Sequence, residues 1–289
     1  MHSAQELVSQ LDALASLPTV YHRIREELDS PEGSVTEVGR LVCADPALSA
    51  RMLRVVNSAL YGYGGQVETI NRAVQILGLQ QVHDLVLAMS ISSVFAGIRP
   101  ENMDMYRFWR GSVMCGLAAR SIARGSGLPS ADRMFVVGLL ADIGHLAMYQ
   151  LVPELAWQAQ QAAVSGSEDV AAAERRIIGC DHAEVAATLA DHWRLPASFA
   201  TILGAQLNPR LGGESSFDAA IIHVAGRIVL ADRDGEPSAA AAARIEAAVW
   251  QQLQMSPDSF GRVREDAELN LAAFVALFFP SLAAAHHHR

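Results

Sequence analysis

Apolar residues recur at helical spacing along most of this chain. Leu7, Leu11 and Leu14 fall on one face of a predicted helix over residues 4–15, which Ser3 is suited to cap. No segment shows the alternation of apolar and polar residues that is typical of a half-buried strand. The pattern therefore predicts an all-α protein, with further helices over about 20–28, 47–60, 70–77, 80–95, 105–124, 154–164, 168–178, 182–192, 197–205, 215–232, 238–254 and 267–278.

Short polar signals mark the start of several helices. Ser34 and Glu37 have the spacing of a capping box, in which the serine binds an early backbone N–H and the glutamate reaches back. Asp45 before Pro46 is a second signal, because aspartate binds free backbone N–H groups and proline fits the first turn. Asp132 is expected to cap a later helix in the same way. These signals predict separate helices after residues 34, 45 and 132.

The best internal boundary lies at residues 97–104, where Gly97, Pro100 and polar residues follow one another. We expect one helical lobe over residues 1–98 and a second over 99–289 that includes a C-terminal helical extension. Residues 283–289 end in three histidines and arginine, and we interpret them as a remnant of an expression tag without a metal role.

Composition and charge narrow the functional class. The 289 residues are 51% hydrophobic and 18% charged, which indicates a globular protein, and the net charge of −9 disfavours a general nucleic-acid binder. All basic residues are arginine, so a lysine nucleophile or Schiff base is excluded. We expect no direct contact with nucleic acid.

Cysteine usage and hydropathy bear on the compartment. Cys43, Cys115 and Cys180 are far apart and odd in number, which favours reduced thiols packed as small hydrophobic side chains. The first residues do not form a signal peptide, and no apolar run reaches the roughly 20 residues that span a bilayer. The sequence thus predicts a cytoplasmic protein without a membrane segment.

Short motifs in a fixed order resemble those of one family. The first part of the chain contains Leu17-Pro18, Asp45-Pro46-Ala47-Leu48, Arg51-Met52-Leu53-Arg54, Asn57-Ser58-Ala59, Ile70, Ala73 and Leu77-Gly78. The second part contains Phe108-Trp109, Gly138-Leu139-Leu140, Asp142-Ile143-Gly144, His182-Ala183-Glu184-Val185 and Trp193-Arg194-Leu195-Pro196. Over roughly residues 10–235 the chain resembles an HDOD domain, the HD-related output domain of bacterial signalling proteins. The segment from Asp45 to Ser58 distinguishes such domains from true HD phosphohydrolases.

The resemblance implies an all-helical fold in two lobes. Residues 1–98 would form the HDOD-specific lobe, and residues 99–289 a lobe built like an HD hydrolase. It also implies a regulatory module rather than an enzyme, commonly linked to receiver, GGDEF or EAL domains and to cyclic-di-GMP signalling. Signalling proteins of these types, or a kinase, are therefore the expected partners, and a homodimer also remains open. No cofactor is expected.

The resemblance also implies where an HD metal site would lie. An HD hydrolase has an early histidine, a His-Asp pair, further downstream histidines and a late aspartate. Most of these positions hold other residues here, namely Gly111, Ala141, Ala205, Gln206 and Gly226. Asp142 and His182 are the two surviving candidate ligands. Because a catalytic divalent ion normally needs at least three protein ligands, we expect neither a metal nor catalysis.

A rebuilt metal site remains open as an alternative. Asp142 and His145 are three residues apart and share a face if the helix continues between them, and His182 could complete the set. The more common interpretation is that Asp142 is a hydrogen-bonded carboxylate that holds helix ends together, and that the histidines are hydrogen-bonded core or surface groups.

Other family-motif residues have a structural and a functional interpretation. Arg51 and Arg54 could face an anionic ligand or partner, but a solvated helix face is the commoner case. Asn57-Ser58 is most simply a helix stop whose amide holds neighbouring backbone, and a relay role is the alternative. Trp109 and Trp193 are expected to be core anchors rather than an exposed interaction patch.

Three functions follow from these features. The first is a non-catalytic signal-transduction module that acts through protein–protein contacts, in a two-component or cyclic-di-GMP-linked pathway. The second is a small-molecule or nucleotide sensor that uses the degenerate HD cleft. The third is a residual metal-dependent phosphohydrolase. The loss of most ligand positions favours the first.

Overall fold

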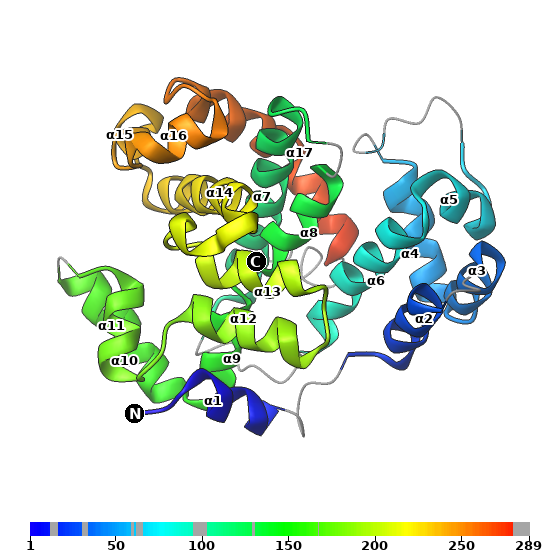
Figure 1. Ribbon diagram of the computed structural model, residues 1–289, viewed down its shortest axis with the longest axis horizontal. Helices are drawn as coiled ribbons and strands as arrows, with labels where there is room; N and C mark the ends of the chain where they lie inside the picture. Colours follow the sequence, from blue (N-terminus) through cyan, green and yellow to red (C-terminus); the bar gives the residue numbers. More distant parts are fainter. Residues whose placement is uncertain are drawn as a thin grey trace. The chain divides into compact units, whose positions relative to one another are not determined.

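The computed structural model contains only helices as regular structure within the part of the chain that it describes, which confirms the predicted all-α class (Figure 1). That part comprises residues 1–11, 17–30, 34–58, 61, 66–94, 103–128, 131–166 and 168–279, with the backbone alone for 91–94. The helices are α1 (Ala4–Leu11), α2 (Thr19–Asp29), α3 (Val35–Cys43), α4 (Pro46–Val56), α5 (Ile70–Leu77), α6 (Leu79–Val94), α7 (Met105–Gly125), α8 (Ala131–Leu140), α9 (Ile143–Leu151), α10 (Pro153–Ser165), α11 (Val170–Ile177), α12 (His182–His192), α13 (Ala197–Ala205), the 3-10 helix η1 (Pro209–Ser215), α14 (Ser216–Asp234), α15 (Ser238–Ala243), α16 (Ala247–Leu253) and α17 (Ser259–Phe278).

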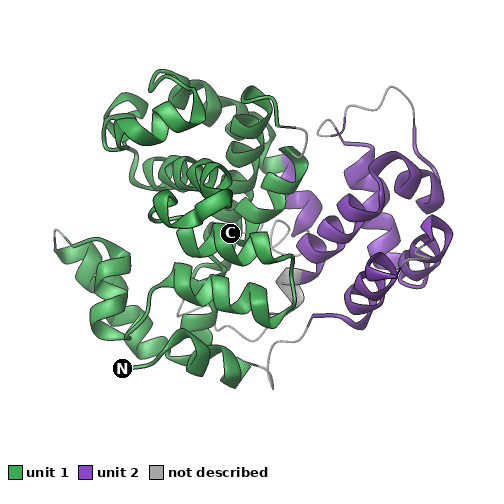
Figure 2. Cartoon of the chain, viewed as in Figure 1, with its two compact units in different colours: residues 1–16, 95–272 green, residues 17–94, 273–289 purple. Residues whose placement is uncertain are grey.

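The chain divides into two compact units (Figure 2). Unit 1 comprises residues 1–16 and 95–272, and unit 2 comprises residues 17–94 and 273–289. This division differs from the expected lobes of 1–98 and 99–289, because residues 1–16, which include α1, belong to unit 1 and residues 273–289 belong to unit 2. Leu7 and Leu11 of α1 are fully buried where the helix packs on α9 and α12, and the His2 N–H donates to the Ile178 carbonyl at 2.6 Å. The expected boundary at 97–104 lies mostly outside the described residues, as do Leu14 and residues 283–289.

Unit 2 packs around α6, whose residues 82–90 are all buried. This fits its nearly continuous apolar sequence. Three polar residues lie within this stretch, His83, Asp84 and Ser90. The ring of His83 is 3.1 Å from Asp84 Oδ1, and the Gln80 amide also donates to Asp84. The buried Asp84 carboxylate therefore has two partners on its own helix, as burial requires.

The start signals in unit 2 are borne out in part. Asp45 accepts hydrogen bonds from the N–H groups of Ala47 and Leu48, with Pro46 in the first turn, as predicted. Ser34 accepts from the N–H of Glu37, but the Glu37 carboxylate pairs with Arg40 instead of reaching back. The capping-box prediction is wrong in this second half, because the Ser34 N–H donates to Glu27 Oε1 at 2.8 Å and Arg40 binds the Glu37 carboxylate.

In unit 1, α7 and α8 approach each other at two glycines. A Cβ on Gly138 would lie 2.8 Å from the Cα of Gly116, and a Cβ on Gly116 would lie 2.6 Å from the Phe135 carbonyl oxygen. Side chains larger than hydrogen would push the helices apart. The predicted Asp132 cap is wrong: α8 begins at Ala131, and the Asp132 carboxylate instead pairs with Arg120 of α7.

The C-terminal helices differ from the predicted boundaries. The single helix expected over 238–254 is two helices, α15 and α16, separated at Glu246, whose ψ of 139° is extended. Helix α17 begins at Ser259 rather than 267, and buries Phe260, Val263 and Ala267 at helical spacing. Charged residues between these three positions hide the apolar face from a search for apolar runs.

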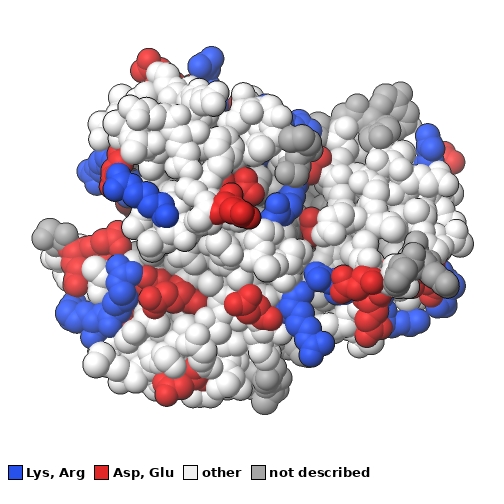
Figure 3. Space-filling model, viewed as in Figure 1, with Lys and Arg blue, Asp and Glu red and all other residues white. Residues whose placement is uncertain are grey.

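Residues Ala131–Leu151 have the length and apolar character of a membrane span, with a mean hydropathy of 1.4, and are the one such stretch found in the described part of the chain. The stretch comprises α8, α9 and the turn between them, and an apolar 18-residue part of it is 78% buried inside the structure. It is a core segment of unit 1. On the face shown in Figure 3, acidic and basic side chains lie interspersed.

Candidate functional site

Three helices of unit 1 bring four titratable side chains together. Asp142 lies in the turn before α9, His145 lies in the first turn of α9, and His182 is the first residue of α12. A Cβ on Gly144 would collide with the backbone carbonyl of His182, so glycine allows the start of α9 to lie against the start of α12. The fourth side chain is Glu174 of α11, only 3% exposed.

The Glu174 carboxylate binds both histidines. Its Oε2 accepts hydrogen bonds from the backbone N–H of His182 at 3.0 Å and from the ring Nδ1 of His182 at 2.7 Å. Its Oε1 lies 2.9 Å from Nε2 of His145. Asp142 lies on the other side of His145, with Oδ1 3.8 Å from its Nδ1. Glu174 is thus the main partner of the two imidazoles.

The imidazole rings are stacked on each other. Their centroids are 4.1 Å apart and their planes differ by 18°. This arrangement lets one carboxylate reach a nitrogen of each ring. We call Asp142, His145, Glu174 and His182 the His–Glu cluster.

The cluster carries opposite charges that stabilise each other. Burial alone would lower the pKa of His182, but its hydrogen bond to Glu174 and the negative charges of Glu174 and Asp142 outweigh this and raise the pKa to about 9. Burial alone would raise the pKa of Glu174, but the two histidines hold it well below its usual range. At neutral pH the pair is therefore an imidazolium and a carboxylate.

The spacing of the cluster is that of a metal site, but its orientation is not. Asp142, His145 and His182 each offer a ligand atom, and these atoms lie within 4.8 Å of one another. An imidazole binds a metal through a lone pair in its ring plane, at about 2.0–2.1 Å for zinc. Two nearly parallel rings whose centroids are 4.1 Å apart cannot both direct such lone pairs at one ion. As the side chains lie, these residues do not fit a metal.

Two of the positions where HD ligands were expected adjoin the cluster. The side-chain amide of Gln206 donates to the Ala141 carbonyl at 2.9 Å, and the backbone carbonyl oxygen of Gln206 lies 2.8 Å from Nδ1 of His223. Burial and the charge of Arg227 hold the pKa of His223 below its usual value, although its hydrogen bond opposes this. Gln206 therefore serves as a hydrogen-bonded link between α14 and the turn before Asp142.

The remaining expected positions are small residues. A Cβ on Gly111 would lie 3.3 Å from Val229, and a Cβ on Gly226 would meet nothing within 4 Å. Ala205 is buried at 3% exposure. None of the three offers a ligand atom.

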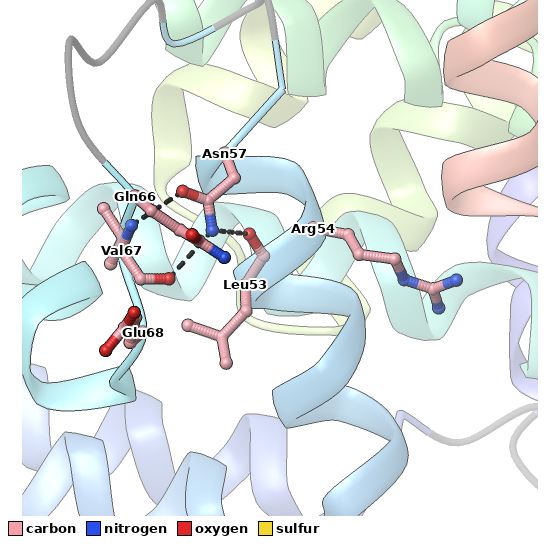
Figure 4. A pocket seen from close by; sticks show the side chains of 6 residues that line it. All are labelled: Leu53, Arg54, Asn57, Gln66, Val67 and Glu68. Atoms are coloured by element: carbon pink, nitrogen blue, oxygen red, sulfur yellow. Dashed lines mark hydrogen bonds between the residues drawn. The ribbon is translucent and has the colours of Figure 1, made fainter.

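A second candidate site lies in unit 2, at the family motif. A cavity of about 640 Å³ is lined by α4 and by the segment before α5 (Figure 4), with the residues Leu53, Arg54, Asn57, Gln66, Val67 and Glu68. Arg54 and Glu68 are exposed and make no hydrogen bond or ion pair with any part of the described chain. The groove combines the apolar side chains of Leu53 and Val67 with one unpaired charge of each sign.

Asn57 builds one wall of this groove. Its amide donates to the carbonyls of Leu53 and Val67 and accepts from the Val67 N–H, each at 2.8 Å (Figure 4). The predicted structural role, an amide that holds neighbouring backbone, is confirmed. Ser58 likewise donates to the Val55 carbonyl at 2.6 Å. A relay role for the pair stays a prediction.

The remaining motif residues differ in how far they are buried. Trp109 and Trp193 are 1% and 5% exposed, as expected of core anchors. Arg51 is half-buried and donates to the Met89 carbonyl at 3.2 Å, so it holds α4 to α6 instead of lying on a solvated face. Arg54 is the exposed arginine of the two.

Sequence reasoning missed Glu174. Its signal was present: Glu174 lies three residues after Ala171 and four before Ile178, and all three are buried. A carboxylate on the buried face of a helix needs a partner. The partners come from two other helices, so the pattern of α11 alone could not name them.

Comparison with known proteins gives one family. The model of the HDOD domain matches residues 14–209. An uncharacterized protein of Treponema pallidum (strain Nichols) is 24% identical over 195 residues, a match that covers 67% of this chain and 37% of that protein. The chain thus spans little more than a third of the length of this relative.

Solved structures share the fold. A crystal structure from Shewanella amazonensis SB2B, named "Putative phosphohydrolase", is 25% identical with a TM-score of 0.71 and covers 98% of both chains. An HDOD domain protein with unknown function from Geobacter sulfurreducens is 24% identical with a TM-score of 0.66, over 98% of this chain and 95% of that one. A "Putative signal transduction protein" from Marinobacter aquaeolei VT8 is 20% identical with a TM-score of 0.68, over 98% and 62%. The two matches under 25% identity establish the fold alone.

Proposed function

The chain belongs to the HDOD domain family, and from that premise we propose that it is a signal-transduction module that acts through contacts with other proteins and catalyses no reaction. Membership of this family supports a signalling role. A regulatory module transmits a signal only when it has two conformations that bind a partner with different affinities. Binding to partner proteins is therefore the property to test.

The observation that carries the non-catalytic part is the His–Glu cluster. A metal-dependent hydrolase needs several protein ligands whose lone pairs converge on an ion that activates water. Here the rings of His145 and His182 are stacked, and Glu174 holds a nitrogen of each. This geometry supports a structural ion pair at the place where a hydrolase would hold its metal.

The partners we propose are signalling proteins of the receiver, GGDEF or EAL type, or a kinase, in a two-component or cyclic-di-GMP-linked pathway of the cytoplasm. The groove of unit 2 supplies a surface for such a contact, because Arg54 and Glu68 are exposed there without partners in the described chain. A partner with complementary charges would pair with both.

The test measures catalysis and binding on the same preparation. Phosphate release from nucleotides, a cyclic dinucleotide and p-nitrophenyl phosphate is assayed with manganese, iron or zinc, for the wild-type chain and Asp142→Ala. Purified receiver, GGDEF, EAL and kinase proteins from the same genome are then titrated against the chain by calorimetry. We expect no phosphate release above that of Asp142→Ala, and saturable binding to at least one partner that Arg54→Glu weakens. Metal-dependent release that Asp142→Ala abolishes, without partner binding, would contradict the proposal.

A metal-dependent phosphohydrolase is the second candidate. Two observations favour it: three ligand atoms within 4.8 Å of one another, and a structural neighbour at 25% identity whose name calls it a phosphohydrolase. The same phosphate-release assay decides between the two functions. A sensor that uses the degenerate HD cleft stays a prediction, for which a stoichiometric calorimetric signal from a nucleotide is the measurement.

A further inference from the structure

We propose that Glu174 is a built-in counter-ion that takes the place of a divalent cation at the His–Glu cluster and keeps metals from binding there. The proposal deepens the function proposed above, since it explains why the site would be inactive. It concerns a residue outside the motifs that define the fold. It also predicts that removing Glu174 increases metal affinity, whereas removing a carboxylate that binds a ligating histidine usually lowers it.

The first step is the position of Glu174. It is 3% exposed and reaches the cluster from α11, a helix separate from those that carry Asp142, His145 and His182. It makes three contacts of 3.0 Å or less with the two histidines, whereas Asp142 Oδ1 lies 3.8 Å from Nδ1 of His145. One carboxylate thus contacts both imidazoles, and it lies closer to His145 than the family aspartate does.

The second step is the orientation that these contacts impose. One oxygen of Glu174 lies at a nitrogen of each ring, and the rings are stacked face to face, with centroids 4.1 Å apart and planes within 18° of parallel. Ligand lone pairs lie in the ring planes, so the two histidines cannot converge on one ion while Glu174 holds them. A metal would first have to break both contacts.

The third step is the alternative role for such a residue. In metal sites a carboxylate often accepts the second N–H of a ligating histidine, which orients the ring and strengthens binding; removing it weakens affinity about 10–100-fold. That role requires the remaining nitrogens to converge, and the stacked rings do not allow this. The two roles therefore predict opposite results when Glu174 is removed.

The experiment measures metal binding directly, without an activity readout. Cobalt(II) is titrated into the full chain, with the d–d absorption of bound cobalt and the metal content after desalting as readouts. The proteins are the wild type, Glu174→Ala, Glu174→Gln and the double variant Glu174→Ala/Asp142→Ala. Glu168→Ala is the matched control, because Glu168 lies near the start of α11 but pairs with exposed Arg176 at 2.6 Å.

We expect the wild type and Glu168→Ala to take up no stoichiometric cobalt. Glu174→Ala should bind one equivalent per chain with a tetrahedral cobalt spectrum, and the double variant should lose it. Glu174→Gln keeps the side-chain shape and gives the same comparison if the alanine variant does not fold. Stoichiometric binding by the wild type that weakens in Glu174→Gln would overturn the proposal, as would folded Glu174 variants that bind no metal. Binding without phosphate release would still leave the signalling function standing, so the two failures are distinguishable.

Discussion

The charge of Glu174 should control how the stability of the protein depends on pH. In the folded protein the pKa of His182 is raised from 6.5 to about 9, chiefly by Glu174 against the opposing effect of burial. A tenfold change in proton affinity corresponds to about 1.4 kcal/mol, so this rise contributes roughly 3 kcal/mol to the free energy of unfolding. Since the folded pKa is the higher one, the contribution is complete below pH 6.5 and is lost as the pH rises through about 9.

Glu174 acts in the opposite direction on the acid side. Its folded pKa lies below the usual 4.5, so its contribution is present above that pH and is lost as the pH falls below it. Replacing Glu174 by glutamine removes the charge and keeps a side-chain carbonyl. The wild type should therefore exceed Glu174→Gln in stability by roughly 3 kcal/mol near pH 6, and the difference should shrink towards pH 9.5.

Urea unfolding followed by circular dichroism at pH 5.5, 7, 8.5 and 9.5 measures this difference. Because both proteins share every other titrating group, subtraction isolates the cluster. Glu168→Gln serves as the control and should follow the wild type at each pH, since its partner Arg176 is exposed. Parallel curves for the wild type and Glu174→Gln across the whole range would refute the assigned ion pair.

Two further predictions concern the packing of single residues. Asn57→Ala loses three hydrogen bonds of 2.8 Å and should lower the free energy of unfolding by about 1–3 kcal/mol in urea titrations. Ser58→Ala loses a single hydrogen bond and should lower the free energy of unfolding by less. Equal losses in the two variants would contradict the role of the asparagine. Gly144→Ala places a methyl group against the backbone of His182 and should lower the free energy of unfolding by about 1–3 kcal/mol. Gly226→Ala meets nothing within 4 Å inside α14 and should be neutral or stabilising by up to about 1 kcal/mol, so a loss there as large as at Gly144 would show that the close contact is not the cause.

Much of the fold could be predicted because helices are local. Spacing alone predicts a buried helix face at Leu7 and Leu11, or at Val38 and Val42. A helix start at Asp45-Pro46 is predicted by contacts within four residues. The prediction fails where a side chain binds a distant or competing partner instead of the nearby backbone. Glu37 binds Arg40, and Asp132 binds Arg120 of another helix, so neither plays the capping role that its position suggests.

The site shows the same limit more strongly. The sequence could identify Asp142, His145 and His182 as a potential set, because their spacing and the family order point to them. It could not show that the two rings are stacked, or that Glu174 of α11 contacts a nitrogen of each. Ring orientation and the choice of counter-ion are set by the packing of three helices, and a pattern along one helix contains neither.

The contact between Gly116 and Gly138 has a consequence for how the protein folds. The two glycines let α7 and α8, neighbours in the chain joined by a short connection, bring their backbones together without any contribution from later helices. Contacts between segments close in sequence form fast, because little loop entropy is lost. We therefore expect this helical hairpin to be a nucleus on which the remaining helices of unit 1 assemble during synthesis, with its amides among the slowest to exchange with solvent.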